Sequence, residues 1–171
     1  MNTSTKTIIS SLYLCFSTMS LAQAKDAAKE PTVSTLRSLL GHKIEDEAIQ
    51  TFVDEQRLSK IAKGDSGSYS RISDETGTFS LLFRGNVISR VIVKLMPTKG
   101  VSSSFKGVLP FQVLRSDTPK DIRKRLAKPQ YDTISKDGDG WLVYQLNGSR
   151  VIFAFMNNKM YEIDLDAPET K

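Results

Sequence analysis

Cysteine, histidine and tryptophan each occur once in the 171 residues. The single cysteine, Cys15, lies in an N-terminal stretch that we expect to be removed, so the mature chain would form no disulfide and no thiolate metal site. The single histidine, His42, lacks the partner that a catalytic triad or a zinc site needs, and we expect a surface or capping role for it. The sequence therefore predicts no catalytic residues, no metal and no cofactor.

Other catalytic signatures are also missing. There is no glycine-rich phosphate loop, and Glu162 and Asp164 share the kind of strand face that water usually covers. The run Asp137-Gly138-Asp139-Gly140 resembles the start of a calcium loop, but the twelfth position, where a glutamate is required, is Gly148. We therefore expect a polar hairpin turn there, and a protein that is not an enzyme.

The charge is only mildly positive. The formal net charge is +5 for the whole sequence, and it falls by one if the N-terminal stretch, with its single cation Lys6, is removed. Such a balance permits a partner protein with an acidic surface but does not indicate nucleic acid.

Residues 1–24 have the pattern of a secretory signal peptide. Lys6 precedes a short apolar stretch from Ile8 to Leu21, and Ala22-Gln23-Ala24 is a small-x-small cleavage site. The stretch is too short and too polar to span a bilayer. Tyr13-Leu14 before Cys15 also disfavours a lipoprotein signal. We expect a periplasmic or secreted protein with no integral membrane segment after cleavage.

A hairpin pattern occurs twice, at residues 83–93 and again 72 residues later at 155–165. The two turns would be Gly85-Asn86 and Asn157-Asn158, residue types that tolerate the positive φ of a tight hairpin turn. Apolar residues match between the copies, Val91 with Ile163 and Val93 with Leu165. The repeat predicts two related units.

The first unit is predicted over residues 33–97, after a leader at 25–32. Apolar spacing predicts helices over 33–40, ended by Gly41, and over 44–56. After a loop at 63–68, alternation predicts strands over 68–72, 78–84 and 87–96. Residues 98–106 are expected to be a linker.

The second unit is predicted over residues 107–166, followed by a tail at 167–171. Thr118 should cap a helix that has Pro119 in its first turn, and Pro129 should end it. Strands are expected over 131–135, 141–146, 151–156 and 159–165. The predicted fold is α+β: two repeated units of helices followed by an antiparallel sheet of three or four strands, joined into one sheet with helices on one face.

Candidate partner-binding residues follow from this arrangement. The side chains that should face away from Val91 and Ile163 are Arg90, Ile92, Lys94, Glu162 and Asp164. Tyr131, Trp141, Tyr144 and Tyr161 are either interface aromatics or ordinary sheet residues. The basic helix with Lys120, Arg123, Lys124, Arg125 and Lys128 could bind an acidic protein or a lipid headgroup, or could be a solvated face. The candidates chosen are Trp141, Tyr144, Arg90, Lys94, Arg123 and Lys124.

Three segments of the second unit are similar to segments of known protein families: Leu109-Pro110-Phe111, residues 117–129, and Gly140-Trp141-Leu142-Val143-Tyr144. Together they resemble the β-lactamase-inhibitor-protein-like superfamily, with its tandem units, and the SmpA/OmlA lipoproteins of the β-barrel assembly machinery. The sequence departs from them at Ala127, where those proteins usually have glycine, and in lacking a lipidated N-terminal cysteine. A related pattern, the Leu39-Leu40-Gly41 helix end, a paired-helix unit and a later Leu-Pro segment, also resembles predicted immunity proteins that neutralise bacterial toxins.

The resemblance implies protein binding through a sheet rather than catalysis. It suggests a secreted or periplasmic inhibitor or immunity protein that neutralises its partner. The alternative is an assembly or structural factor of the cell envelope. An enzyme acting on an envelope component is the third alternative.

Overall fold

In the computed structural model, residues 30–61, 69–97, 101 and 103–168 are described. They form an α+β fold with few helices and one antiparallel sheet. The helices are α1 (Val33–Ser38), α2 (Glu47–Glu55) and α3 (Pro119–Leu126). The strands are β1 (Ser59–Ile61), β2 (Tyr69–Ser73), β3 (Phe79–Arg84), β4 (Val87–Lys94), β5 (Tyr131–Asp132), β6 (Gly140–Leu146), β7 (Ser149–Met156) and β8 (Lys159–Asp166). The expected signal peptide, most of the leader, the loop at 63–68 and the end of the tail lie outside the described residues.

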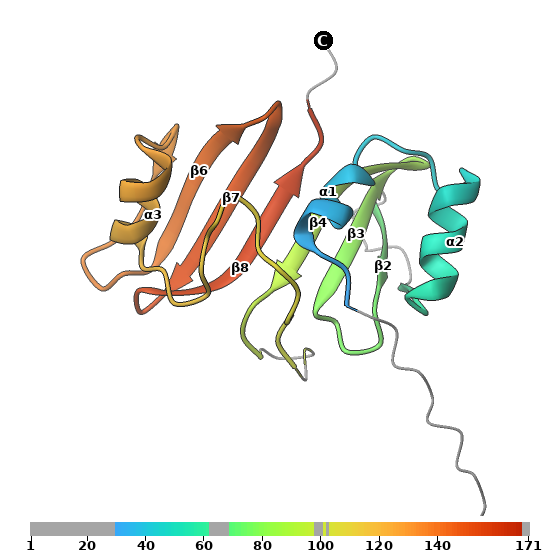
Figure 1. Cartoon of the computed structure of the whole chain (residues 1–171), viewed down its shortest axis with the longest axis horizontal. Coiled ribbons are helices and arrows are strands. Elements are labelled where there is room, and N and C mark those ends of the chain that lie inside the picture. The colour runs from blue at the N-terminus through green and yellow to red at the C-terminus, as the bar shows by residue number, and fades with distance from the viewer. Residues whose placement is uncertain (1–29, 62–68, 98–100, 102, 169–171) are drawn as a thin grey trace, which may run out of the picture.

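The eight strands form a single sheet in the order β1-β2-β3-β4-β8-β7-β6-β5. Its two central strands, β4 and β8, pair through Val91 with Leu165, Ile92 with Asp164 and Val93 with Ile163. The last strands of the two halves of the chain therefore meet at the middle of the sheet, and the preceding strands of each half lie outward from this pair (Figure 1).

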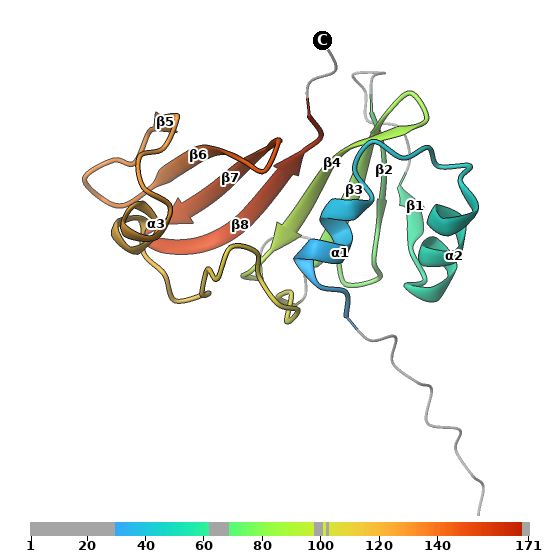
Figure 2. The same cartoon turned by 45° about the horizontal axis from the view of Figure 1, so that its top comes forward.

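The three helices cover one face of this sheet, as the turned view in Figure 2 shows. Because side chains alternate along a strand, the residues in register with Val91 and Val93 point to the helices. They include Leu81, Phe153, Ile163 and Leu165, all fully buried in the main apolar core. The opposite face, which we call the open face, carries no helix from the described part of the chain.

Helix α3 begins as the sequence predicts. The Thr118 hydroxyl accepts a hydrogen bond from the Asp121 backbone N–H at 3.4 Å, and the Asp121 carboxylate accepts one from the Thr118 N–H at 3.0 Å. This reciprocal capping box, with Pro119 in the first turn, satisfies backbone donors that the helix itself cannot. The helix ends at Leu126, because Ala127 adopts a φ of 63° and a ψ of −146°.

Replacing Ala127 by glycine should stabilise the fold. A residue with a side chain is strained in this backbone region, whereas glycine adopts it without strain. Glycine also makes the unfolded chain more flexible, which offsets part of the gain. The net effect of Ala127→Gly should be a rise of about 1 kcal/mol in the free energy of unfolding. Urea denaturation measures the change. The matched control is Ala48→Gly on the exposed side of α2, which should lower stability by about 1 kcal/mol. Equal losses in both variants would contradict strain at Ala127.

The hairpin turns are those that the sequence predicts. Asn147-Gly148 joins β6 to β7, and Asn157-Asn158 joins β7 to β8, with all four residues at positive φ. Gly85, at a φ of 63°, begins the turn from β3 to β4. These turns set the strand register, and hence decide which side chains reach the open face.

Several predicted boundaries were wrong. Strand β1 was not expected, and β5 is two residues long rather than five. The segment expected to be a linker contributes Val101 and Phe105 to the buried residues, and the Phe105 ring packs edge-on against Phe79 at 6.4 Å. A short run between polar residues can therefore still supply core side chains.

Candidate partner-binding surface

The open face consists of side chains in register with Ile92 and Asp164. Across the middle of the sheet, Ser80, Ile92, Asp164, Ile152 and Val143 occupy successive strands. Val143 and Ala154 are buried, although neither belongs to the main core on the helical side. The open face is thus packed with small aliphatic and polar side chains at its centre.

An ionic network crosses the open face over β4, β8 and β7. The Arg90 guanidinium donates to both Asp166 oxygens, at 2.5 and 3.2 Å, and lies 3.8 Å from Asp164. Arg150 donates to Asp166 at 3.4 Å, and Lys94 pairs with Glu162. The predicted orientation of Arg90 and Lys94 is confirmed by the register, but carboxylates of the same chain already face both cations.

Asp164 is the most deeply buried carboxylate of this network, at 9% exposure. Burial raises its pKa to about 6; Arg90 lowers this pKa, and Asp166 raises it. Its Oδ1 atom has no hydrogen-bond partner within the described residues. Burial also lowers the pKa of Lys94, whereas Asp164 raises it. A charged Asp164 therefore carries a desolvation cost that its neighbours only partly offset.

Exposed apolar side chains gather at one corner of the open face. Trp141 on β6 is 50% exposed, Tyr131 on β5 is 58% exposed, and Met156 on β7 is 47% exposed. Trp141 pairs with Ala154, two residues before Met156, and Tyr131 pairs with Val143, two residues after Trp141. By alternation all three lie on the open face, with Trp141 between Tyr131 and Met156 and diagonal to each, and we call them the aromatic corner.

Tyr144 does not belong to this surface. It pairs with Val151 on the helical side, is buried, and stacks edge-on with Phe153 at 5.9 Å. Its hydroxyl donates to the Ala127 carbonyl at 3.3 Å, which gives a buried tyrosine its polar partner. Met156 was not among the binding residues predicted from the sequence, although its alternation with the core residue Phe155 could have placed it on the open face.

The basic helix divides into paired and unpaired cations. Arg123 donates to both Asp132 oxygens, at 2.7 and 2.9 Å, and this bond lowers the pKa of Asp132. Arg125 lies 3.2 Å from the buried Asp117. Lys124 is exposed and makes no ion pair with any residue that the structure describes. Since α3 covers the helical face, Arg123 and Lys124 do not extend the open face.

The remaining sequence candidates have local roles. His42 lies 3.2 Å from Asp46, the N-cap of α2. Asp139 accepts from the Asn157 N–H at 2.6 Å, so this part of the predicted turn supports the β7–β8 hairpin. Among the described ranges there is no cluster of three metal-ligating side chains, and no helix there is long and apolar enough to cross a membrane.

Comparisons with known proteins identify no family. No family model matches the sequence, and no curated protein matches it. Among solved structures, the chain is similar to a DUF4309 family protein (YjgB) from Bacillus subtilis, with 11% identity and a TM-score of 0.47 over 82% of this chain and 95% of that one. This likeness is too distant to identify a function.

Proposed function

We propose that this protein is a non-enzymatic protein-binding module that acts in the periplasm or after secretion, as an inhibitor or immunity protein. The observation that carries the proposal is the aromatic corner of Tyr131, Trp141 and Met156 on the open face, which no helix of the described residues covers. Large apolar side chains are costly to leave in water, and tyrosine, tryptophan and methionine are enriched in protein interfaces. Such a cluster beside a polar network fits an interface core with a polar rim.

The ionic network defines which partner fits. Because Arg90 and Arg150 share Asp166, and Lys94 faces Glu162, this part of the open face largely neutralises its own charges. The remaining attraction for an acidic surface is weaker than unpaired cations would provide. We therefore propose a partner that presents an apolar patch to the aromatic corner and polar groups to the network.

The proposal includes a tandem origin for the sheet. What supports it is a constant offset of 72 residues: α2 begins at Glu47 and α3 at Pro119. Irregularities in the strand pairing follow Leu82 in β3 and Ala154 in β7, again 72 residues apart. Ile92 and Asp164, which occupy equivalent positions, pair with each other between β4 and β8. An approximate two-fold axis at this pair would relate two copies of one ancestral unit.

Trp141→Ala should weaken partner binding while the protein stays folded. Truncating a central aromatic side chain typically costs about 2 kcal/mol or more, or about 30-fold in affinity. Immobilised wild type should retain a partner protein from an extract of the source organism's cell envelope, and immobilised Trp141→Ala should retain less of it. Titrating the purified partner against each protein then measures the two dissociation constants. Arg90→Ala should have a smaller effect, because Arg90 already has a carboxylate partner.

The matched control is Lys136→Ala, an exposed residue between β5 and β6 outside the aromatic corner. It should leave the dissociation constant unchanged. If wild type and Trp141→Ala capture the same proteins with the same affinity, the open face is not the binding surface.

A further inference from the structure

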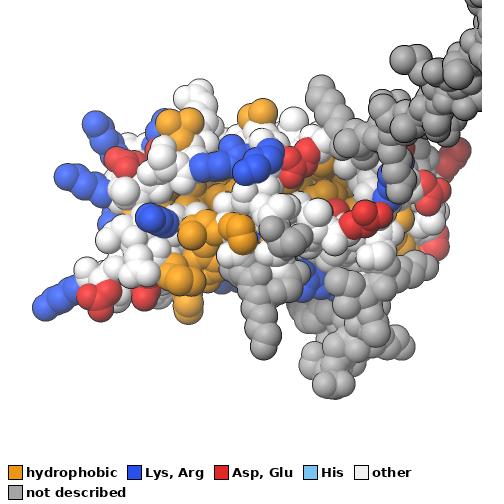
Figure 3. Space-filling view, turned by 90° about the horizontal axis from the view of Figure 1, so that it is seen from below, with side chains coloured by type: hydrophobic (Ala, Val, Ile, Leu, Met, Phe, Trp, Pro, Cys, Tyr) orange, Lys and Arg blue, Asp and Glu red, His pale blue; other side chains and the backbone are white. Residues whose placement is uncertain are grey.

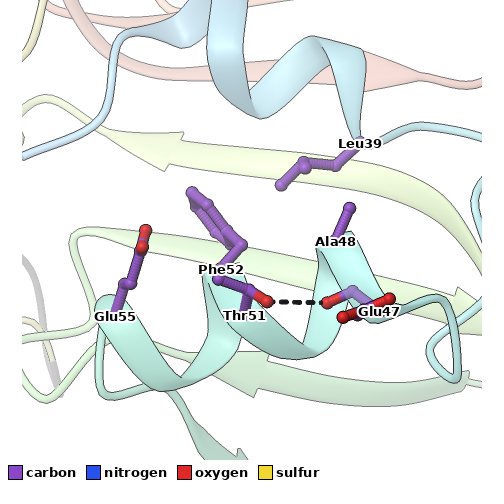
Figure 4. A pocket seen from close by; sticks show the side chains of 6 residues that line it. All are labelled: Leu39, Glu47, Ala48, Thr51, Phe52 and Glu55. Atoms are coloured by element: carbon purple, nitrogen blue, oxygen red, sulfur yellow. Dashed lines mark hydrogen bonds between the residues drawn. The ribbon is translucent and has the colours of Figure 1, made fainter.

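A second surface lies on the helical side, between the end of α1 and helix α2. It is an open groove of about 490 Å³ (Figure 4). Its lining residues are Leu39, Glu47, Ala48, Thr51, Phe52 and Glu55. Leu39 points toward Ala48 and Phe52, so an exposed Ala48 and the last exposed edges of Leu39 and Phe52, 8% and 9% exposed, form an apolar floor, while Glu47 and Glu55 stand at its two ends.

The rim of this groove is acidic. Residues 45–55 contain five carboxylates and no lysine or arginine. Glu47 and Glu55 are exposed, and neither makes an ion pair with a residue in the described ranges. An apolar floor between unpaired carboxylates is complementary to an apolar side chain surrounded by cations.

The α3 end of the molecule combines an exposed apolar side chain with several cations. Residues 119–128 contain five cations and one carboxylate. Lys120 and Lys124 are exposed and unpaired within the described part of the chain. Leu114, which precedes α3, is 57% exposed, and its N–H donates at 2.9 Å to Asp117, the carboxylate that Arg125 contacts. We call Leu114 together with α3 the basic end.

The groove and the basic end cannot meet within one molecule. They lie at opposite ends of the sheet in Figure 1, and in Figure 3 Lys and Arg side chains project at the α3 end, with some Asp and Glu beside them, while further Asp and Glu side chains lie at the α2 end. A second copy of the chain can bring them together.

We propose that the groove between α1 and α2 receives the basic end of a second copy, with Leu114 over Phe52 and lysines of α3 opposite Glu47 and Glu55. The contact joins two different surfaces, so it leaves one groove and one basic end free and can extend to further copies. It does not use the open face. The small contact and its exposed charges make the association weak and sensitive to salt.

Sedimentation velocity of the purified protein tests this association. Mean mass should rise with concentration at an ionic strength of about 20 mM and return to the monomer value at about 500 mM. The double variants Glu47→Lys/Glu55→Lys and Lys120→Glu/Lys124→Glu should each weaken association at least about 10-fold. Leu114→Ser should weaken it without changing any charge. The matched controls Glu75→Lys and Lys136→Glu alter exposed charges elsewhere and should associate as wild type does.

Mixing the two double variants gives the decisive result. The reversed groove of one then faces the reversed basic end of the other, and the unaltered groove and unaltered basic end also match, so the mixture should form assemblies with equal numbers of the two variants although neither variant associates alone. A wild-type protein that stays monomeric at low salt would overturn the proposal. So would double variants that associate as wild type does, or a mixture of the two that does not associate.

Discussion

Ile163→Ala should lower the free energy of unfolding by about 2–5 kcal/mol. Ile163 is fully buried on the central strand β8, between Val93 of β4 and Phe153 of β7. Removing its side chain leaves a cavity in the middle of the sheet, where strands on both sides limit collapse. Globular proteins have total stabilities of about 5–15 kcal/mol, so this loss is a large fraction of the whole. Urea denaturation measures it directly.

Trp141→Ala is the matched comparison, because it removes a larger side chain from the opposite side of the sheet. We expect a loss of no more than about 1 kcal/mol, since half of this side chain already faces water. Phe52→Ala should resemble Ile163→Ala, because the Phe52 ring packs against Phe79 at 6.3 Å. If Trp141→Ala unfolds as readily as Ile163→Ala, then Trp141 supports the fold and cannot be assigned mainly to binding.

The sequence predicts those parts of the fold that local rules determine. Alternation places Val91, Val93 and Ile163 on one face, and two-residue turns fix the register of each hairpin. The start of α3 follows from Thr118 and Pro119 alone. Each feature depends on residues a few positions apart, which is why a single sequence is sufficient.

Features that depend on distant contacts could not be predicted in this way. Phe105 becomes buried because its backbone N–H bonds to Lys94 and its ring meets Phe79. Tyr144 was assigned to the surface by its residue type, whereas its alternation with Trp141 and its bond to Ala127 place it inside. The pairing of Arg90 with Asp166 spans 76 residues, so no local pattern shows that this cation is neutralised.

The groove of the α1–α2 surface illustrates the same limit. Helical spacing predicts that Phe52 faces inward, but it does not show that Leu39, Ala48 and Phe52 line a groove beside Glu47 and Glu55. The acidic and basic helices are visible in the sequence, yet their positions at opposite ends of one sheet depend on the strand order. The candidate interfaces therefore arise from topology more than from motifs.

Asp164→Asn should raise the free energy of unfolding at neutral pH, because it removes the cost of burying a charged carboxylate. In the unfolded chain this carboxyl titrates near its ordinary pKa of 3.8, whereas burial raises the pKa in the folded protein to about 6. The folded state therefore binds more protons between these values, and stability falls as pH rises through this window. The difference of about 2 pKa units corresponds to about 3 kcal/mol at pH values above 6.

The asparagine has the shape of the protonated carboxyl group and cannot ionise, so its stability advantage over wild type should be small near pH 4 and approach about 3 kcal/mol near pH 7.5. Urea denaturation of both proteins at the two pH values gives the double difference, in which groups other than residue 164 cancel. Asp166→Asn is the matched control on the same strand and should be destabilising at pH 7.5, because Asp166 accepts from both Arg90 and Arg150. A lower stability of Asp164→Asn than of wild type at pH 7.5 would show that attraction from Arg90 and Lys94 outweighs the cost of burying the charge.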